Sequence, residues 1–201
     1  MTQRPDEPLR VALLHHGYGV SEGSDAARVV GELADGLRVA GHHPCVLTSQ
    51  PGVTRRFTEE GIPVVQVGRL PEGMMRRRGF AGPLTHVPLT VKALVGAGCD
   101  VAHAFSPQDA LAGTLWRRLV GRPTVFTCLA TLTRERLADR RLRLLLLRHA
   151  VEGSDMVIAP SVEGGEALWR WMALDAPVID SRDAAAHERA YRRLMAHRSG
   201  S

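Results

Sequence analysis

The residues best suited to contact a phosphate or a sugar lie in a glycine-rich stretch after the first apolar segment. It reads His15-His16-Gly17-Tyr18-Gly19-Val20-Ser21-Glu22-Gly23-Ser24-Asp25. Glycines let the backbone approach a ligand closely, and a helix beginning near Ser24 would offer unpaired amides to a phosphate or sugar oxygen. A flexible connection with an ordinary helix cap would use the same residues. The stretch therefore predicts a ligand-contacting loop, with simple capping as the alternative.

The glycines of this loop form only a weak dinucleotide motif. Gly17, Gly19 and Gly23 give a loose G-x-G-x-x-x-G, and a dinucleotide-binding domain also needs an acidic residue ending the second strand to hold a ribose. That position falls at Thr48-Ser49-Gln50, which contains no carboxylate. A nicotinamide-dependent oxidoreductase is therefore a minor alternative.

Other well-known catalytic motifs are missing from the sequence. There is no phosphate-binding G-x-x-x-x-G-K, no G-x-S-x-G nucleophile elbow, no paired C-x-x-C and no H-E-x-x-H. His15-His16 and His42-His43 are adjacent pairs, and neighbours on a strand point to opposite faces. We therefore expect neither a bound metal nor a resident cofactor.

Polar residues follow two later apolar segments. His103 lies in a predicted strand near its ligand-facing end, where it could hydrogen-bond a hydroxyl or satisfy a neighbouring carbonyl within the core. Ser106 and Asp109 fall at the first turn of the next helix, and Ser161 follows the strand that ends at Ala159. Serine and aspartate cap helices at such positions, and capping is the simpler interpretation of Ser161.

The elements that must position these residues alternate between short apolar strands and longer amphipathic helices. Strands are predicted over residues 9–14, 44–48, 63–67, 101–105, 124–127, 156–159 and 177–179, and helices over 24–40, 107–120, 132–151, 162–172 and 183–197. This pattern closes as an α/β fold with a Rossmann-like parallel sheet of about six to seven strands and helices on both faces. Ligands gather beyond the carboxyl ends of strands in such a sheet, which is where the polar residues fall.

The composition excludes several classes of protein. The 201 residues carry 26 basic and 21 acidic side chains, a net charge of +5, and all basic residues except Lys92 are arginine. A modest charge reads no nucleotide sequence, and with 4% aromatic residues few bases could stack, so we expect no nucleic-acid partner. No apolar run approaches the length of a membrane-spanning helix.

The cysteines and the polar start of the chain favour a cytoplasmic protein. Cys45, Cys99 and Cys128 are odd in number, widely spaced and placed in or beside apolar segments, so buried reduced thiols are favoured over disulfides or a metal site. Residues 2–10 are polar and lack the apolar core of a secretory signal.

Over residues 55–83 the periodicity dissolves, and apart from the strand predicted at 63–67 this long stretch is expected to be rich in loops. It contains Arg76, Arg77 and Arg78 beside Met74 and Met75. These side chains could contact anionic lipid at a membrane surface or a phosphorylated acceptor, although a solvated run of charge is the commoner outcome.

The order of the remaining motifs carries a family resemblance. In chain order they are Glu22-Gly23-Ser24-Asp25, the helix end and strand over 37–48, Asp100-Val101-Ala102-His103-Ala104, the segment Gly121-Arg122-Pro123-Thr124-Val125-Phe126-Thr127, and 154–161. This order resembles the N-terminal domain of the family 4 glycosyltransferases of the GT-B fold, over roughly residues 9–179.

The resemblance implies an acceptor-binding half whose cleft is completed by a second, donor-binding half. It implies that Gly23, Ser24 and Asp25 face the phosphates of a nucleotide-sugar, the co-substrate. It places His103, Ser106 and Asp109 on the acceptor side and Ser161 at the rim of the cleft. In this family the transfer needs no metal and retains the anomeric configuration.

Three departures from the family pattern matter. Phe105 stands where many members have a second histidine, and Cys128-Leu129-Ala130 replaces the usual histidine-glycine after the fifth strand. After Ile179 the chain continues as Asp180-Ser181-Arg182-Asp183 in place of the turn into the donor domain. The last helix, 183–197, resembles the C-terminal helix that packs back on the N-terminal half in the two-domain enzymes.

The resemblance therefore predicts an acceptor-side domain that transfers a sugar onto a small-molecule acceptor only with a separate donor-binding half, and no catalytic residue is assigned. Half a cleft supplies only part of the binding that stabilises the transition state. A non-catalytic binding or regulatory module, or the remnant of a glycosyltransferase, is the alternative, because the donor half is missing and Phe105 cannot exchange a proton.

Overall fold

A seven-stranded sheet forms the centre of the molecule. The computed structural model describes residues 7–18, 24–69, 84–129 and 141–199. The strands are β1 (Arg10–Leu14), β2 (His43–Pro51), β3 (Arg55–Glu59), β4 (Ile62–Arg69), β5 (Val101–Ala104), β6 (Thr124–Thr127) and β7 (Met156–Ile158), in the spatial order β3-β4-β2-β1-β5-β6-β7. Every neighbouring pair is parallel except β3 and β4. The predicted parallel sheet is thus confirmed, with one antiparallel strand added at its edge.

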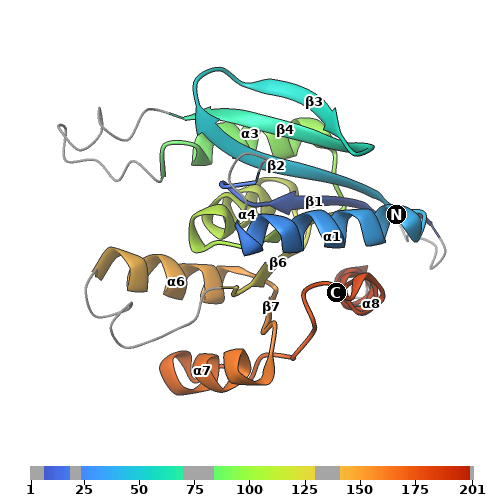
Figure 1. Ribbon diagram of the computed structural model, residues 1–201. Helices are drawn as coiled ribbons and strands as arrows, with labels where there is room; N and C mark the ends of the chain where they lie inside the picture. Colours follow the sequence, from blue (N-terminus) through green and yellow to red (C-terminus); the bar gives the residue numbers. More distant parts are fainter. Residues whose placement is uncertain (1–6, 19–23, 70–83, 130–140, 200–201) are drawn as a thin grey trace.

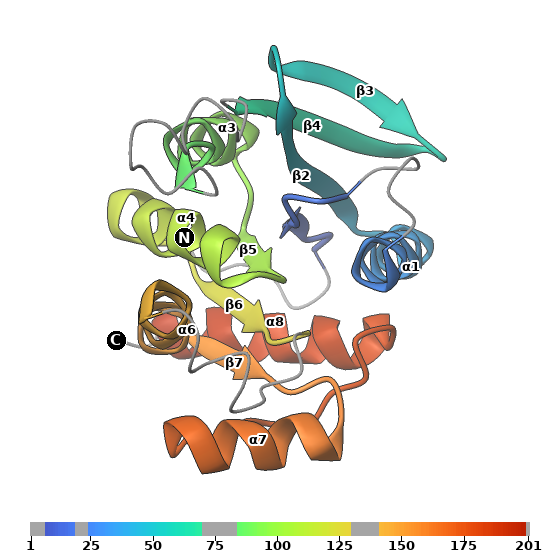
Figure 2. The ribbon, with the colours of Figure 1, turned by 60° about the vertical axis from the view of Figure 1, so that its left-hand side comes forward.

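Helices cover both faces of this sheet. They are α1 (Asp25–Val39), α3 (Val87–Ala97), α4 (Pro107–Val120), α6 (Arg141–Gly153), α7 (Val162–Met172) and α8 (Ala184–Ser199). In Figure 1, α1 lies in front of the sheet and α3 and α4 lie behind it, and Figure 2 shows α8 running along β6 and β7. None of the described helices is both long enough and apolar enough to span a bilayer.

Strand β1 shows how the sequence builds two hydrophobic cores. Val11 and Leu13 point to one face and pack with residues of α1 and α8, whereas Ala12 and Leu14 point to the other and pack with residues of α3 and α4. All four side chains are fully buried. A strand buried on both faces must be apolar at every position, which is why β1 reads as a continuous run.

Two elements were not predicted. The edge strand β3 is exposed and polar, so it shows no apolar pattern, and it is joined to β4 by the two-residue turn Glu60-Gly61, both with positive φ (49° and 82°). Helix α3 contains Pro88, but in its first turn, where a missing N–H costs nothing. The expectation of a loop-rich stretch over residues 55–83 was wrong at its start, where β3 forms.

The remaining boundaries agree with the pattern of apolar residues. Strand β6 and helices α4 and α7 match the predicted residues 124–127, 107–120 and 162–172. The doubtful strand at 177–179 is reduced to a single bridge between Val178 and Ala159. The predicted helix 132–151 is described from Arg141 onward, as α6.

Candidate functional site

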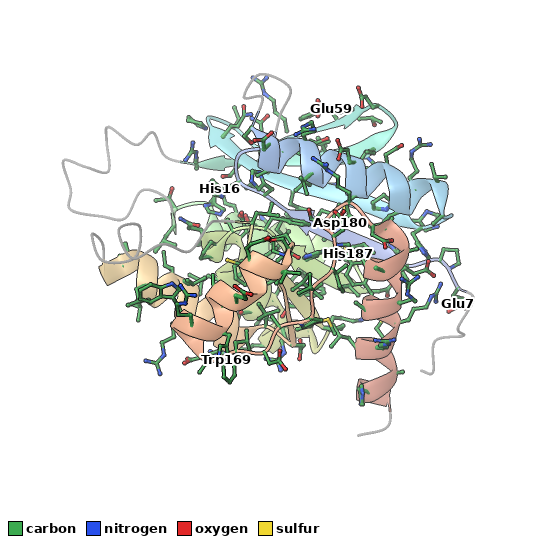
Figure 3. The ribbon with its side chains drawn as sticks, turned by 60° about the horizontal axis from the view of Figure 1, so that its bottom comes forward. Glu7, His16, Glu59, Trp169, Asp180 and His187 are labelled. Carbon is green, nitrogen blue, oxygen red and sulfur yellow. The ribbon has the colours of Figure 1, made fainter. Side chains whose placement is uncertain are left out.

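Polar side chains from three elements meet at the carboxyl ends of β1 and β5. His15 and His16 directly follow β1, and Ser106 and Asp109 begin α4, which follows β5. His86 stands immediately before α3 and lies against Asp109. Figure 3 labels His16 at this edge of the sheet. We call these five residues the Asp109 cluster.

Asp109 is the centre of this cluster. Its side chain is almost completely buried, yet its carboxylate accepts four hydrogen bonds. The donors are the backbone N–H of His16 (3.0 Å), Nδ1 of His16 (3.0 Å), Oγ of Ser106 (2.6 Å) and Nε2 of His86 (3.0 Å). A buried carboxylate needs such a set of donors, because an unpaired charge in the interior is strongly destabilised. Asp109 therefore fixes the relative positions of β1, α3 and α4.

These contacts decide the charge of Asp109 and the form of both imidazoles. Burial opposes ionisation, but the hydrogen bonds and charges of His16 and His86 outweigh it and lower the pKa of Asp109 below its ordinary value of 3.8. An ionised carboxylate only accepts, so Nδ1 of His16 and Nε2 of His86 must carry the protons. The side chain of His16 remains 34% exposed, so part of this oriented imidazole faces solvent.

Two further imidazole nitrogens in the cluster are buried without a hydrogen-bond partner among the described residues. They are Nδ1 of His15 and Nδ1 of His86. Burial lowers the pKa of His15, against the attraction of Asp109, so this ring tends to be neutral. Buried polar atoms are nearly always paired, so each of these nitrogens leaves one hydrogen bond unmade among the described residues.

The end of β2 supports the first loop through two side-chain hydroxyls. Oγ1 of Thr48 donates to the carbonyl of Tyr18 at 2.9 Å, and Oγ of Ser49 donates to the carbonyl of His16 at 3.4 Å. Hydroxyl groups at these positions support the loop that carries His16.

The predicted phosphate-facing residues lie at the beginning of α1. Oγ of Ser24 accepts the N–H of Ala27 at 3.1 Å, so Ser24 is the helix cap that the sequence predicts. Asp25 is exposed and pairs with Arg28 at 2.9 Å. Gly23 lies outside the described residues. Contact of these residues with a phosphate stays a prediction.

His103 lies in the core and is not part of the Asp109 cluster. Its side chain is fully buried, with Nδ1 2.7 Å from the hydroxyl of Tyr191 in α8 and Nε2 2.7 Å from the hydroxyl of Thr127 in β6. The ring of Phe105 packs on it, with the centroids 4.2 Å apart. Burial, with a smaller effect of His187, lowers the pKa of His103 well below 6.5. Both nitrogens of a neutral ring are therefore occupied by protein hydroxyls, which favours the core interpretation.

Of the other predicted residues, Ser106 and Ser161 cap helices. Oγ of Ser106 accepts the N–H of Asp109 at 3.2 Å, and Oγ of Ser161 accepts the N–H of Gly164 at 3.2 Å at the start of α7. Arg76, Arg77 and Arg78 lie outside the described residues. Within the described ranges, no three histidine, cysteine or acidic side chains are grouped to hold a metal ion.

His16 belongs to the predicted ligand-contacting loop but was given no role of its own, and His86 was not predicted as a site residue. Adjacent histidines suggested side chains diverging from a strand, but His16 lies beyond the end of β1, where the alternation no longer holds. His86 precedes a helix that was not predicted. The one feature of the sequence that could have pointed to His86 is its place directly before an apolar stretch.

Solved structures of the same fold cover most of this chain. One solved chain of sucrose-phosphate synthase from Thermosynechococcus elongatus matches with a TM-score of 0.63 and 17% identity, over 92% of this chain and 98% of that one. A second solved chain of that protein matches with a TM-score of 0.65 and 17% identity, over 85% of this chain and 47% of that one. Anabaena HepE, solved in complex with UDP and glucose, matches with a TM-score of 0.59 and 18% identity, over 85% of this chain and 44% of that one.

These matches share a fold, and this chain spans about half the length of the two longer structures. No curated protein sequence matches the chain. Residues 26–180, more than half of the chain, match the family described as glycosyl transferase 4-like domain. The resemblance inferred from the order of motifs is therefore confirmed, and this chain belongs to the glycosyl transferase 4-like domain family.

Proposed function

We propose that this chain is the acceptor-side half of a glycosyltransferase. It binds a small-molecule acceptor and takes part in sugar transfer from a nucleotide-sugar when a separate donor-binding half completes the cleft. One observation carries this proposal. The chain matches nearly the whole length of one solved sucrose-phosphate synthase chain but only about half the length of a longer one. The UDP and glucose held by HepE support a nucleoside-diphosphate sugar as the donor.

The Asp109 cluster is the proposed acceptor site. It lies at the carboxyl edge of the sheet, where α1 and α4 also begin, so backbone amides and the His16 imidazole are directed to one region. Asp109 holds Nδ1 of His16 as a donor and so fixes the ring orientation. We propose that the exposed part of His16 contacts an acceptor hydroxyl.

In this proposal the chain lines only one side of the substrate cleft, so sugar transfer needs a second, donor-binding half to line the other side. The departing diphosphate and the acceptor must be held together in a water-poor site, and each interaction that strengthens in the transition state contributes to the rate. Residues of one domain can supply only their own share. A cytoplasmic location is part of the same proposal, supported by three cysteines that carry no disulfide.

The test combines the purified chain with nucleotide-sugars and with candidate donor-binding proteins encoded beside its gene. The assay follows release of nucleoside diphosphate and the mass of the glycosylated product. His16→Ala should reduce transfer by about tenfold or more, as expected for loss of one directed hydrogen bond in a dry site. His43→Ala is the matched control, because His43 is exposed at the start of β2 and far along the strand from this edge. A stable complex without any transfer would contradict the proposal and indicate a binding module.

A further inference from the structure

Two cysteines lie together near the amino ends of the strands, at the end of the sheet opposite to the Asp109 cluster. The sulfur atoms of Cys45 and Cys99 are 3.8 Å apart, although the residues are 54 positions apart in the chain. Cys45 belongs to β2, opposite Ala12 of β1, and Cys99 follows Gly98, the residue that caps the end of α3. A disulfide requires about 2.05 Å between the sulfurs, so the two side chains must bring their sulfurs closer together before the bond can form.

This pair is accessible to a small reagent. A cavity of about 480 Å³ opens at the amino ends of β2 and β4, and both cysteines line it together with Arg10, Phe57, Ala93 and Ala97. Cys45 is partly exposed, whereas Cys99 is buried. The cavity therefore presents Cys45 first to anything that enters.

The surroundings make the two thiols unequal. A hydrogen bond with the Cys99 thiol, and to a smaller extent the charge of Arg10, lower the pKa of Cys45 against the opposing effect of burial. The same hydrogen bond and burial raise the pKa of Cys99. Cys45 therefore has the greater thiolate character, and the thiolate is the reactive form of cysteine.

We propose that Cys45 and Cys99 form a reversible redox pair that hydrogen peroxide converts into an intrachain disulfide. The Cys45 thiolate attacks one oxygen of peroxide, the O–O bond breaks, and hydroxide leaves as Cys45 becomes a sulfenic acid. The Cys99 sulfur then gives up its proton and attacks the Cys45 sulfur. The S–S bond forms and water leaves, so two thiols are oxidised while one peroxide is reduced to two waters.

The test exposes the purified chain to a small excess of hydrogen peroxide and then alkylates the remaining thiols under denaturing conditions. Peptide mass spectrometry should show Cys45 and Cys99 joined and Cys128 alkylated, and the protein should stay monomeric on a non-reducing gel. Cys128 is the internal control, because it too is buried but lies away from this cavity. Dithiothreitol should restore both thiols.

Single substitutions distinguish the role of Cys45, which reacts with peroxide, from that of Cys99, which then forms the disulfide. The Cys99→Ser variant should accumulate a sulfenic acid at Cys45, which a dimedone probe captures. The Cys45→Ser variant should form no cross-link. The Cys128→Ser variant should form the same cross-link as the unaltered chain. The cross-link should raise the melting temperature by about 5 °C or more, since it closes a long loop. The proposal is overturned if both thiols remain alkylatable under conditions that oxidise free cysteine in the same tube, or if Cys128 or a second chain enters the disulfide. Neither result depends on sugar transfer.

Discussion

Replacement of Asp109 by asparagine should weaken the whole carboxyl edge of the sheet. The asparagine side chain has nearly the same shape, but it carries no charge and turns one acceptor oxygen into an NH2 donor. The side chain must then face the donors of His16, Ser106 and His86 that now bind the carboxylate. Some of these buried donors would lose their acceptor.

The expected cost follows from the number and kind of these contacts. A hydrogen bond to a charged group contributes about 1.5–3 kcal/mol, and breaking a buried charge pair typically costs about 3–5 kcal/mol. Because the asparagine oxygen retains part of the set, we expect a loss of about 3 kcal/mol in the free energy of unfolding. For a protein of this size that corresponds to a fall in melting temperature of roughly 6–12 °C.

Urea denaturation followed by circular dichroism measures this change. Asp25→Asn is the matched control, because Asp25 is 94% exposed and its contact with Arg28 is screened by solvent, so its effect should stay within about 0.5 kcal/mol. The penalty for Asp109→Asn should shrink as the pH falls below about 4, because the unfolded chain then takes up a proton at Asp109 before the folded chain does. Equal and small effects of the two substitutions at pH 7 would refute the role assigned to Asp109.

Three further predictions concern packing and acid stability. Burial lowers the pKa of His187 to about 4, so as the pH falls below 6.5 the unfolded chain binds a proton at this residue before the folded chain does. Urea titrations should therefore show a loss of up to about 3 kcal/mol in the free energy of unfolding by pH 4. A stability profile against pH that is unchanged by His187→Gln would contradict this. Gly68→Ala should lower the free energy of unfolding by roughly 2 kcal/mol, since the added Cβ would lie 2.2 Å from the carbonyl oxygen of Gly52. Gly96→Ala is the matched control and should be neutral or stabilising, because the space around Gly96 is open. Thermal melts that fail to separate the two variants would disprove the close approach of Gly68 and Gly52. Tyr191→Phe should lose about 1 kcal/mol by removing the hydrogen bond to the buried histidine of β5, and an unchanged urea midpoint would argue against that bond.

The sequence predicted those parts of the fold that depend on local patterns of apolar residues. The continuous run of β1 and the capped, periodic α1 and α4 were found because buried strands and amphipathic helices leave such patterns. The strand β3 left no apolar pattern because it is an exposed edge strand, stabilised by its pairing with β4.

The candidate site was only partly predictable, because it is made by residues that are distant in the chain. Asp109 and Ser106 were identified from their place after β5, at the first turn of a helix. The partners His16 and His86 lie 93 and 23 positions away from Asp109, and the packing of α3 against α4 brings His86 into contact. For His103, the core interpretation is favoured by the contact with Tyr191, 88 positions away on α8, which no local pattern could indicate.

Sugar transfer by the chain with and without a donor-binding half tests the central claim most directly. The measurement is the initial rate of nucleoside diphosphate release from a nucleotide-sugar in the presence of acceptor, for the isolated chain, for the donor-binding protein alone and for the two together. The proposed division of the cleft predicts background rates for either protein alone and acceptor-dependent turnover for the mixture. Full turnover by the isolated chain, or a mixture no faster than its separate components, would contradict it.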